Sequence, residues 1–402
     1  MVTEGPLDPP DPGCAKVGDH AVNSKPSLVY RPGVRWDDVQ GTDRHLVERL
    51  ADQTRVLWVD PPLSLARASS GPMTLSRRSG QLTQVADNVW RSVTLAPPFP
   101  DRRLTRPVSA MLLRRSVSAA LAVLGWTPAA LVVSSPQPQS GLVRDVPYVY
   151  YATDDFVAGA DLLRTSPAVM HDAEQGQLRV ANALVSVSPV LLHRWGEDNR
   201  PRLLLPNGCD VDAYASVDTS PLPADVALPA PVAGVVGQLS GRLDLDLLEA
   251  VAAAGISLLL VGPTGRGLDA GRFRTLVDLP NVQWVGQKAY SELTSYLHVI
   301  DVGLTPYADT AFNRASFPLK TLEYLAAGRA VVSTPLPAVD DLATPLISTA
   351  STPEGFVLAT RALLAQPRTH TSAAARRAFA AQHSWASRAE TLWRFIESLA
   401  AR

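Results

Sequence analysis

Lys320 and Glu323 stand three residues apart in a stretch, residues 313–334, whose pattern predicts a loop, a helix, a turn and a strand. On a helix, side chains at this spacing project from roughly the same side. A cation beside phosphates, with a carboxylate one turn deeper, could hold a nucleotide, the carboxylate accepting hydrogen bonds from both ribose hydroxyls. The alternative is a solvated Lys–Glu pair on an ordinary helix, and the spacing alone leaves both interpretations open.

The elements around this pair are those that build ligand sites in α/β proteins. Val299–Thr305 (VIDVGLT) predicts a buried parallel strand, and residues 306–317 form the loop that leaves its carboxyl end. Ser316 can cap the following helix, Pro318 suits its first turn, and Gly328 is the expected stop. The loop therefore feeds a helix N-terminus at a strand end, where backbone N–H groups can bind phosphate.

The stretch PLKTLEYLAAGRAVV, residues 318–332, resembles the donor-binding signature of retaining GT-B glycosyltransferases of the "glycosyl transferases group 1" type, which includes glycogen synthase. In that family a glutamate on this helix binds the ribose of the donor, and Glu323 matches that glutamate. The family usually carries a second glutamate eight positions earlier, where this chain has Ala315. The form of the motif resembles a subgroup that builds cell-surface polysaccharides, in which Lys320 would supply compensating charge.

Three further stretches carry the resemblance. PNGCD at residues 206–210 is similar to the family's crossing between domains. The turn from Gly237 to Arg242 precedes a predicted helix, and the resemblance implies that Arg242 binds the donor diphosphate. VQWVG, which ends at Gly286, resembles the family segment whose backbone recognises the base of the donor nucleotide. The resemblance therefore assigns the donor to Gly237, Arg242, Gly286, Ser316, Phe317, Pro318, Leu319, Lys320 and Glu323.

Two carboxylates, Asp154 and Asp155, follow the predicted strand Tyr148–Tyr151. Carboxylates at a strand's carboxyl end are placed for catalysis or for sugar hydroxyls. They could equally cap the next helix. In the family this loop faces the donor sugar and the acceptor, so the resemblance implies that Asp154 and Asp155 are catalytic.

Trp36, Asp37 and Asp38 follow the first predicted strand, Ser27–Tyr30, in a strand–helix–strand unit. The resemblance places them as acceptor-side residues of the cleft, and the alternative is a surface turn. The predicted helix Asp101–Trp126 carries arginines among apolar residues. Such a helix can lie on an anionic membrane surface, or it can pack on the core with a solvated basic face.

The bulk composition narrows the function classes. The 402 residues are 46% hydrophobic and carry 37 basic against 38 acidic side chains, so nothing indicates a nucleic-acid partner. Cys14 and Cys209 form no metal motif and suit a reducing compartment. The first residues lack the pattern of a signal peptide. We therefore expect a cytoplasmic protein, with peripheral contact at the inner membrane surface left open.

The sequence as a whole predicts an α/β protein of the GT-B type, with two Rossmann-like doubly wound domains facing across a cleft. We expect a disordered tail (1–25), an acceptor-side domain (26–206), a nucleotide-sugar-binding domain (207–380) and a C-terminal helix (381–402) packing back on the first domain. The implied activity is sugar transfer from a nucleotide-sugar to a glycan, lipid-linked or small-molecule acceptor, with retention and without metal or cofactor. The alternatives are a nucleotide-sugar epimerase of the same fold and a non-catalytic nucleotide-sugar-binding protein.

Overall fold

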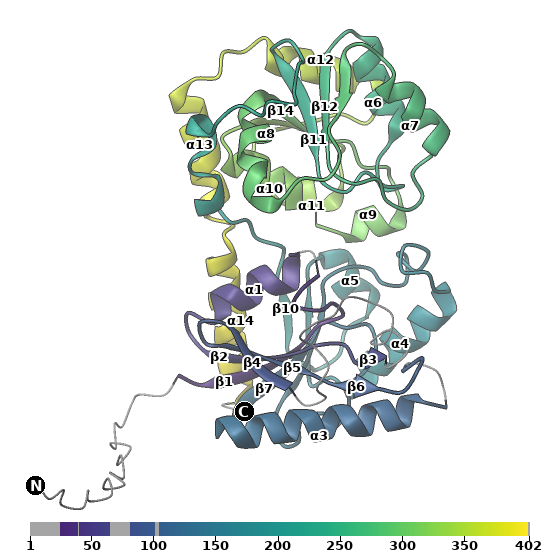
Figure 1. Cartoon of the computed structure of the whole chain (residues 1–402), viewed down its shortest axis with the longest axis vertical. Coiled ribbons are helices and arrows are strands. Elements are labelled where there is room, and N and C mark those ends of the chain that lie inside the picture. The colour runs from purple at the N-terminus through teal and green to yellow at the C-terminus, as the bar shows by residue number, and fades with distance from the viewer. Residues whose placement is uncertain (1–24, 39, 65–80, 101–103, 318, 401–402) are drawn as a thin grey trace, which may run out of the picture.

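The computed structural model describes residues 25–38, 40–64, 81–100, 104–317 and 319–400. The chain folds into two α/β halves stacked along the long axis of the molecule (Figure 1). The predicted tail lies almost wholly outside the described residues, as does Pro318.

The first domain is built on an eight-stranded sheet in the order β10-β9-β8-β7-β1-β2-β5-β4. All neighbours are parallel except β4 and β5, which form an antiparallel edge that the sequence analysis did not predict. The inner strands are short apolar runs buried on both faces, as parallel sheets require. In sheet order the strands are Arg202–Leu204, Ala183–Ser186, Tyr148–Ala152, Pro128–Val133, Ser27–Arg31, Arg55–Val59, Val89–Val93 and Gln81–Ala86.

Four α-helices position the loops of this domain: α1 (Thr42–Leu50), α3 (Arg106–Leu124), α4 (Pro167–Val180) and α5 (Pro189–Arg194). Helices α4 and α5 each begin with proline after a capping serine, Ser166 or Ser188. A two-stranded sheet pairs β3 (Leu63–Ser64) with β6 (Leu95–Ala96). In the described part of the chain, α3 is the one helix with the length and apolar composition of a membrane span.

The second domain has a six-stranded, fully parallel sheet in the order β13-β12-β11-β14-β15-β16. This order reverses direction between β11 and β14, and doubly wound sheets bind ligands at the carboxyl edge of such a switch point. In sheet order the strands are Val282–Trp284, Ser257–Val261, Val232–Val236, Ile300–Thr305, Ala330–Ser333 and Ile347–Thr349. The predicted strand at 299–305 is confirmed, beginning one residue later.

The helices of the second domain cover both faces of its sheet (Figure 1). They are α6 (Leu245–Ala253), α7 (Ala270–Val277), α8 (Leu293–Val299), α9 (Ala311–Ala315), α10 (Leu319–Ala326), α11 (Pro337–Asp340), α12 (Pro353–Leu364) and α13 (His370–Ala381). Short 3-10 turns lie at η1 (Asp212–Tyr214), η2 (Val217–Thr219) and η3 (Tyr290–Glu292).

The last helix, α14 (Trp385–Ala400), returns to the first domain and packs on α1 and β7. Its buried face carries Trp385, Leu392 and Ile396, close to the predicted amphipathic pattern. The expected crossing back of the C-terminal helix is therefore confirmed. The chain first crosses from the first domain to the second after β10. The predicted hinge residue, Pro206, comes two residues after that strand ends.

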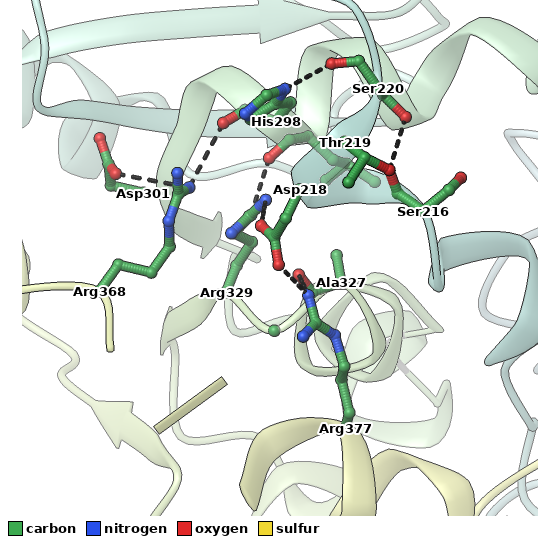
Figure 2. A network of polar contacts seen from close by, with 12 residues as sticks. Ser216, Asp218, Thr219, Ser220, His298, Asp301, Ala327, Arg329, Arg368 and Arg377 are labelled. Atoms are coloured by element: carbon green, nitrogen blue, oxygen red, sulfur yellow. Dashed lines mark hydrogen bonds and ion pairs between the residues drawn. The ribbon is translucent and has the colours of Figure 1, made fainter. Parts of the chain in front are cut away.

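An ion-pair network around the buried Arg329 joins the segment between the two sheets to the second domain (Figure 2). Asp218, on η2, accepts hydrogen bonds from Arg329 and Arg377. Arg329 is fully buried after the end of α10 and also donates to the carbonyl of Leu297 at 2.8 Å. Partial burial acts to raise the pKa of Asp218, but the two arginines outweigh it and lower the pKa to about 2. A buried guanidinium is tolerated here because the linker supplies its carboxylate.

We predict that Asp218→Asn lowers the free energy of unfolding by about 1–2 kcal/mol at neutral pH, because Arg329 stays buried without its counter-charge while solvent screens the exposed side of Asp218. The folded pKa lies below the unfolded value, so the pair stabilises the protein above about pH 4 and is lost as the pH falls toward 2. Urea unfolding across that range should show a shallower acid dependence in the variant. Asp212→Asn, an exposed position on η1, is the matched control. Equal stability of the Asp218 variant and wild type would show that the network is not stabilising.

Candidate active site

Tyr324 fixes helix α10, the predicted donor helix, against the sheet. Its hydroxyl accepts a hydrogen bond from the backbone N–H of Val236 in β11 at 2.7 Å. A Cβ on Gly303 in β14 would lie 2.3 Å from the Tyr324 ring, so glycine is required where the ring crosses that strand. The start of α10 is thereby held at the carboxyl edge of β11 and β14, the switch point of the sheet.

Glycines bring the ends of β11, β12 and β13 close together. Gly237 and Gly262 adopt φ angles of +137° and +141°, which side-chain-bearing residues rarely adopt. A Cβ on Gly262 would lie 1.8 Å from the carbonyl oxygen of Gly237, and the Gly262 N–H donates to the Gly286 carbonyl at 2.8 Å. The two predicted donor glycines, Gly237 and Gly286, therefore lie at one edge with exposed backbone beside them.

Lys320 and Glu323 meet at this edge. Their Nζ and Oε2 atoms lie 2.5 Å apart, and the side chain of Glu323 is only 8% exposed. A Cβ on Gly237 would lie 3.2 Å from Cε of Lys320, so the lysine side chain crosses the glycine turn. The interpretation as a solvated surface pair is therefore wrong, since a buried carboxylate is held beside a cation at the switch point.

Arg242 extends from the same turn between two aromatic rings. Its guanidinium carbon lies 5.2 Å from the ring centre of Tyr307 and 4.8 Å from that of Phe312, and its Nε donates to Oδ1 of Asn313 at 2.9 Å. The Asn313 amide in turn donates to the carbonyls of Arg242 and Ala308. This buried asparagine joins the Arg242 turn to the loop after β14, and the sequence analysis did not identify it. The only sequence signal for this residue was its position at the start of the stretch 313–334.

The loop expected over residues 306–317 contains the short helix α9, capped by Thr310. Ala315, where the family usually carries a second glutamate, closes this helix and is 1% exposed. It packs within the apolar core cluster of the first domain, and α9 contacts α5. The methyl side chain therefore serves a tight contact between the two domains.

Asp154 joins the two domains directly. Its Oδ1 lies 2.8 Å from the Ser316 hydroxyl, which also lies 2.9 Å from the carbonyl oxygen of Phe312. Burial raises the pKa of Asp154, and the charge of Arg242 opposes that shift. Because a hydroxyl has one proton, Ser316 donates either to the Asp154 carboxylate or to the carbonyl of Phe312. Ser316 thus lies against the first domain at the end of α9.

A second contact between the domains involves Phe317. Its carbonyl accepts a hydrogen bond from Nδ2 of Asn207, which follows the hinge residue Pro206. The Asn207 side chain also accepts from the Thr42 hydroxyl at the start of α1. The hinge, the first domain and the loop before α10 are therefore joined by one amide side chain.

Asp155 has structural partners on both carboxylate oxygens. Its Oδ1 accepts from the backbone N–H groups of Val157 and Ala158 at 3.1 and 3.0 Å, and its Oδ2 pairs with Arg194. Arg194 also binds Glu174 on α4. These contacts favour the capping alternative for this member of the pair, and its catalytic role stays a prediction.

The predicted acceptor-side residues also have structural partners. Trp36 is 6% exposed and packs edge-on against Trp58 in the core, with ring centres 5.0 Å apart. Asp37 pairs with Arg91 at 2.7 Å, and Asp38 accepts from the backbone N–H of Arg35. The surface-turn interpretation therefore describes this segment, whose tryptophan anchors it to the sheet.

Comparison with known proteins finds a family match in the second domain. Residues 231–366 match the family model described as Glycosyl transferases group 1. The curated relative, a putative teichuronic acid biosynthesis glycosyltransferase TuaH of Bacillus subtilis (strain 168), is 33% identical over 159 residues. That match covers 38% of this chain and 40% of the relative.

Solved structures extend the likeness to both domains. Sucrose-phosphate synthase from Thermosynechococcus elongatus superposes with a TM-score of 0.69 at 18% identity, over 93% of this chain and 99% of that one. Alr3699/HepE of Anabaena, in complex with UDP and glucose, gives 0.63 at 15% identity over 92% and 99%. The fold is therefore GT-B, and the expected architecture of two Rossmann-like domains is confirmed.

Proposed function

We propose that this protein is a glycosyltransferase that moves a sugar from a nucleotide-sugar donor to an acceptor, with retention at the anomeric carbon. The observation that carries the proposal is the group formed by Arg242, Lys320 and Glu323 at the switch point of the second sheet, opposite Asp154 of the first domain. The family match in the second domain and the names of the relatives support the same reaction class.

In the proposed reaction a diphosphate leaves while positive charge grows on the sugar ring. Arg242, Lys320 and the N-terminal N–H groups of α10 would neutralise the leaving group. Lys320 contacts Oε2 of Glu323, and the ribose hydroxyls would donate to Oε1. Asp154 would contact the reacting sugar or the acceptor. Contact between the domains would exclude water and so limit hydrolysis.

The acceptor would be a glycan, a lipid-linked glycan or a small molecule, and the protein would act in the cytoplasm. Peripheral contact with the inner membrane surface is part of this proposal. Helix α3 packs on the first sheet through one face and exposes Val108, Met111 and Val123 on the other, with Arg114 and Arg115 also exposed. Exposed apolar and basic side chains on one helix suit an anionic lipid surface.

A screen of nucleotide-sugars by thermal shift tests the proposal, because a ligand that binds the folded state raises its apparent stability. The donor found there is then assayed for transfer to acceptors in an extract. Donor binding followed by transfer is expected. Turnover with no acceptor would indicate the epimerase, and binding with no transfer to any acceptor would indicate a non-catalytic protein.

We predict full transfer activity in excess EDTA. Asp244 and Asp246 have the D-x-D spacing that binds a metal–nucleotide in a different glycosyltransferase fold. Here Asp244 caps α6 by accepting from the N–H of Asp246, and Asp246 pairs with Arg272, so both side chains have partners within the second domain. Leaving-group charge would instead be neutralised by Arg242 and Lys320. The measurement is the transfer rate before and after chelation. Activity that disappears with EDTA and returns with magnesium or manganese would contradict the prediction.

A further inference from the structure

A cavity of about 520 Å³ lies in the first domain between α3, α4 and the loop after β7. Every described residue that lines it falls between Arg31 and Arg179, so the described donor-binding residues of the second domain take no part in it. Its volume is within the range of sites that hold small molecules. The cavity is therefore a separate place where a ligand of sugar-phosphate size would fit.

Arginine residues from three elements line this cavity. Arg106 and Arg114 reach it from α3, Arg179 from α4 and Arg31 from the end of β1. Within residues 25–38, 40–64, 81–100, 104–317 and 319–400, no ion pair joins Arg106, Arg114 or Arg179 to a carboxylate. Arg114 donates one hydrogen bond to the carbonyl of Ser140 at 3.0 Å.

The balance of charge in the described lining is strongly positive. Arg106, Arg114 and Arg179 stand against a single carboxylate, Asp172, which is exposed. Like charges placed together repel, so the arrangement costs stability unless an anion completes it. Planar guanidinium groups match the oxygens of a phosphate by paired hydrogen bonds, and several of them can bind one such group at once.

The wall of the cavity opposite α3 is held by hydrogen bonds within the protein. Gln177, fully buried on α4, donates to the carbonyls of Ser135 and Gln137 at 2.6 and 3.0 Å. Its Oε1 accepts from the Tyr148 hydroxyl, which itself accepts from the N–H of Gln139. Burial raises the pKa of Tyr148 to about 12, so the hydroxyl stays a donor at neutral pH. A rigid wall reduces the entropy lost when a ligand binds.

We propose that this cavity binds a phosphate-ester group through Arg106, Arg114 and Arg179. The phosphate belongs either to a soluble phosphorylated sugar or to a lipid headgroup. The inference does not depend on the transfer reaction, because none of the proposed donor residues lines the cavity.

The test compares wild type with Arg106→Gln/Arg179→Gln. Glucose 6-phosphate is titrated by calorimetry, and sedimentation measures binding to phosphatidylglycerol vesicles and to phosphatidylcholine vesicles. We expect at least one phosphate probe to bind wild type and to bind the variant about tenfold more weakly or worse, since two charge-assisted hydrogen-bonding groups are lost. Weakening confined to the sugar phosphate identifies a soluble ligand, and weakening confined to the anionic vesicles identifies a headgroup.

Arg115→Gln is the matched control, because Arg115 is exposed beside Arg114 on α3 and does not line the cavity. Lys320→Gln should leave phosphate binding at the cavity unchanged, which separates this site from the donor site. Arg106→Gln alone keeps the test valid if the double variant does not fold. No phosphate binding by wild type, or equal weakening by Arg115→Gln, would overturn the proposal. Absence of nucleotide-sugar binding would reject the proposed function and leave the phosphate site standing.

Discussion

Asp154→Asn should lower kcat and kcat/KM together by about 100-fold or more, the range expected for a group that acts in the transition state. Nucleotide affinity should stay unchanged, because the proposed nucleotide ligands Arg242, Lys320 and Glu323 belong to the other domain. Burial raises the pKa of Asp154, and its contact with Ser316 places it where the domains meet. Transfer rates and calorimetric titration with the donor measure the two quantities.

Asp155→Asn is the matched comparison, one residue away and with the same change in charge. Asp155 closes a turn and pairs with Arg194, so this variant should lose about 2 kcal/mol of stability and keep its transfer rate per folded molecule. Normal transfer by the Asp154 variant would reject its catalytic role, and the reacting groups would then have to be sought in other strand-end loops of the first domain.

Glu323→Ala should weaken donor binding by about 1.5–3 kcal/mol, the value of a hydrogen bond to a charged group. The carboxylate is buried beside Lys320 at the switch point, and the ribose hydroxyls would be its ligands. Calorimetry with the donor from the screen measures the change, and the melting temperature verifies that the variant is folded.

Glu354→Gln provides the control for this experiment. Glu354 lies exposed in the first turn of α12 in the same domain, away from the described donor residues. Its loss should leave donor affinity unchanged. Unaltered affinity in the Glu323 variant would show that the carboxylate stabilises the helix without binding the nucleotide.

The donor half of the site was predictable because its parts are close together in sequence. The strand at 299–305, the helix that carries Lys320 and Glu323, and the stop at Gly328 follow one another along the chain. Apolar run length and turn residues report such local order well. The resemblance to a family supplied the role of Glu323, which spacing alone left open.

The first domain was predicted less completely. Its central strands are apolar runs and were expected, whereas α4 and the antiparallel edge strand β4 were not. Strand β4 is partly exposed and its composition is mixed, so periodicity does not distinguish it from a loop. The cavity beside α4 was therefore beyond the sequence analysis.

The sequence by itself determined the central parallel strands of both sheets and the helix with Lys320 and Glu323, because each depends on local apolar patterning and backbone freedom. The crossing back of the last helix was expected from the family resemblance. Only the tertiary structure distinguished Asp154 from Asp155, since one lies 2.8 Å from a residue 162 positions away and the other caps its own turn. It also decided that Trp36 belongs to the core and that Asn313 joins two loops of the second domain. These outcomes depend on contacts between distant segments, which neither composition nor spacing contains.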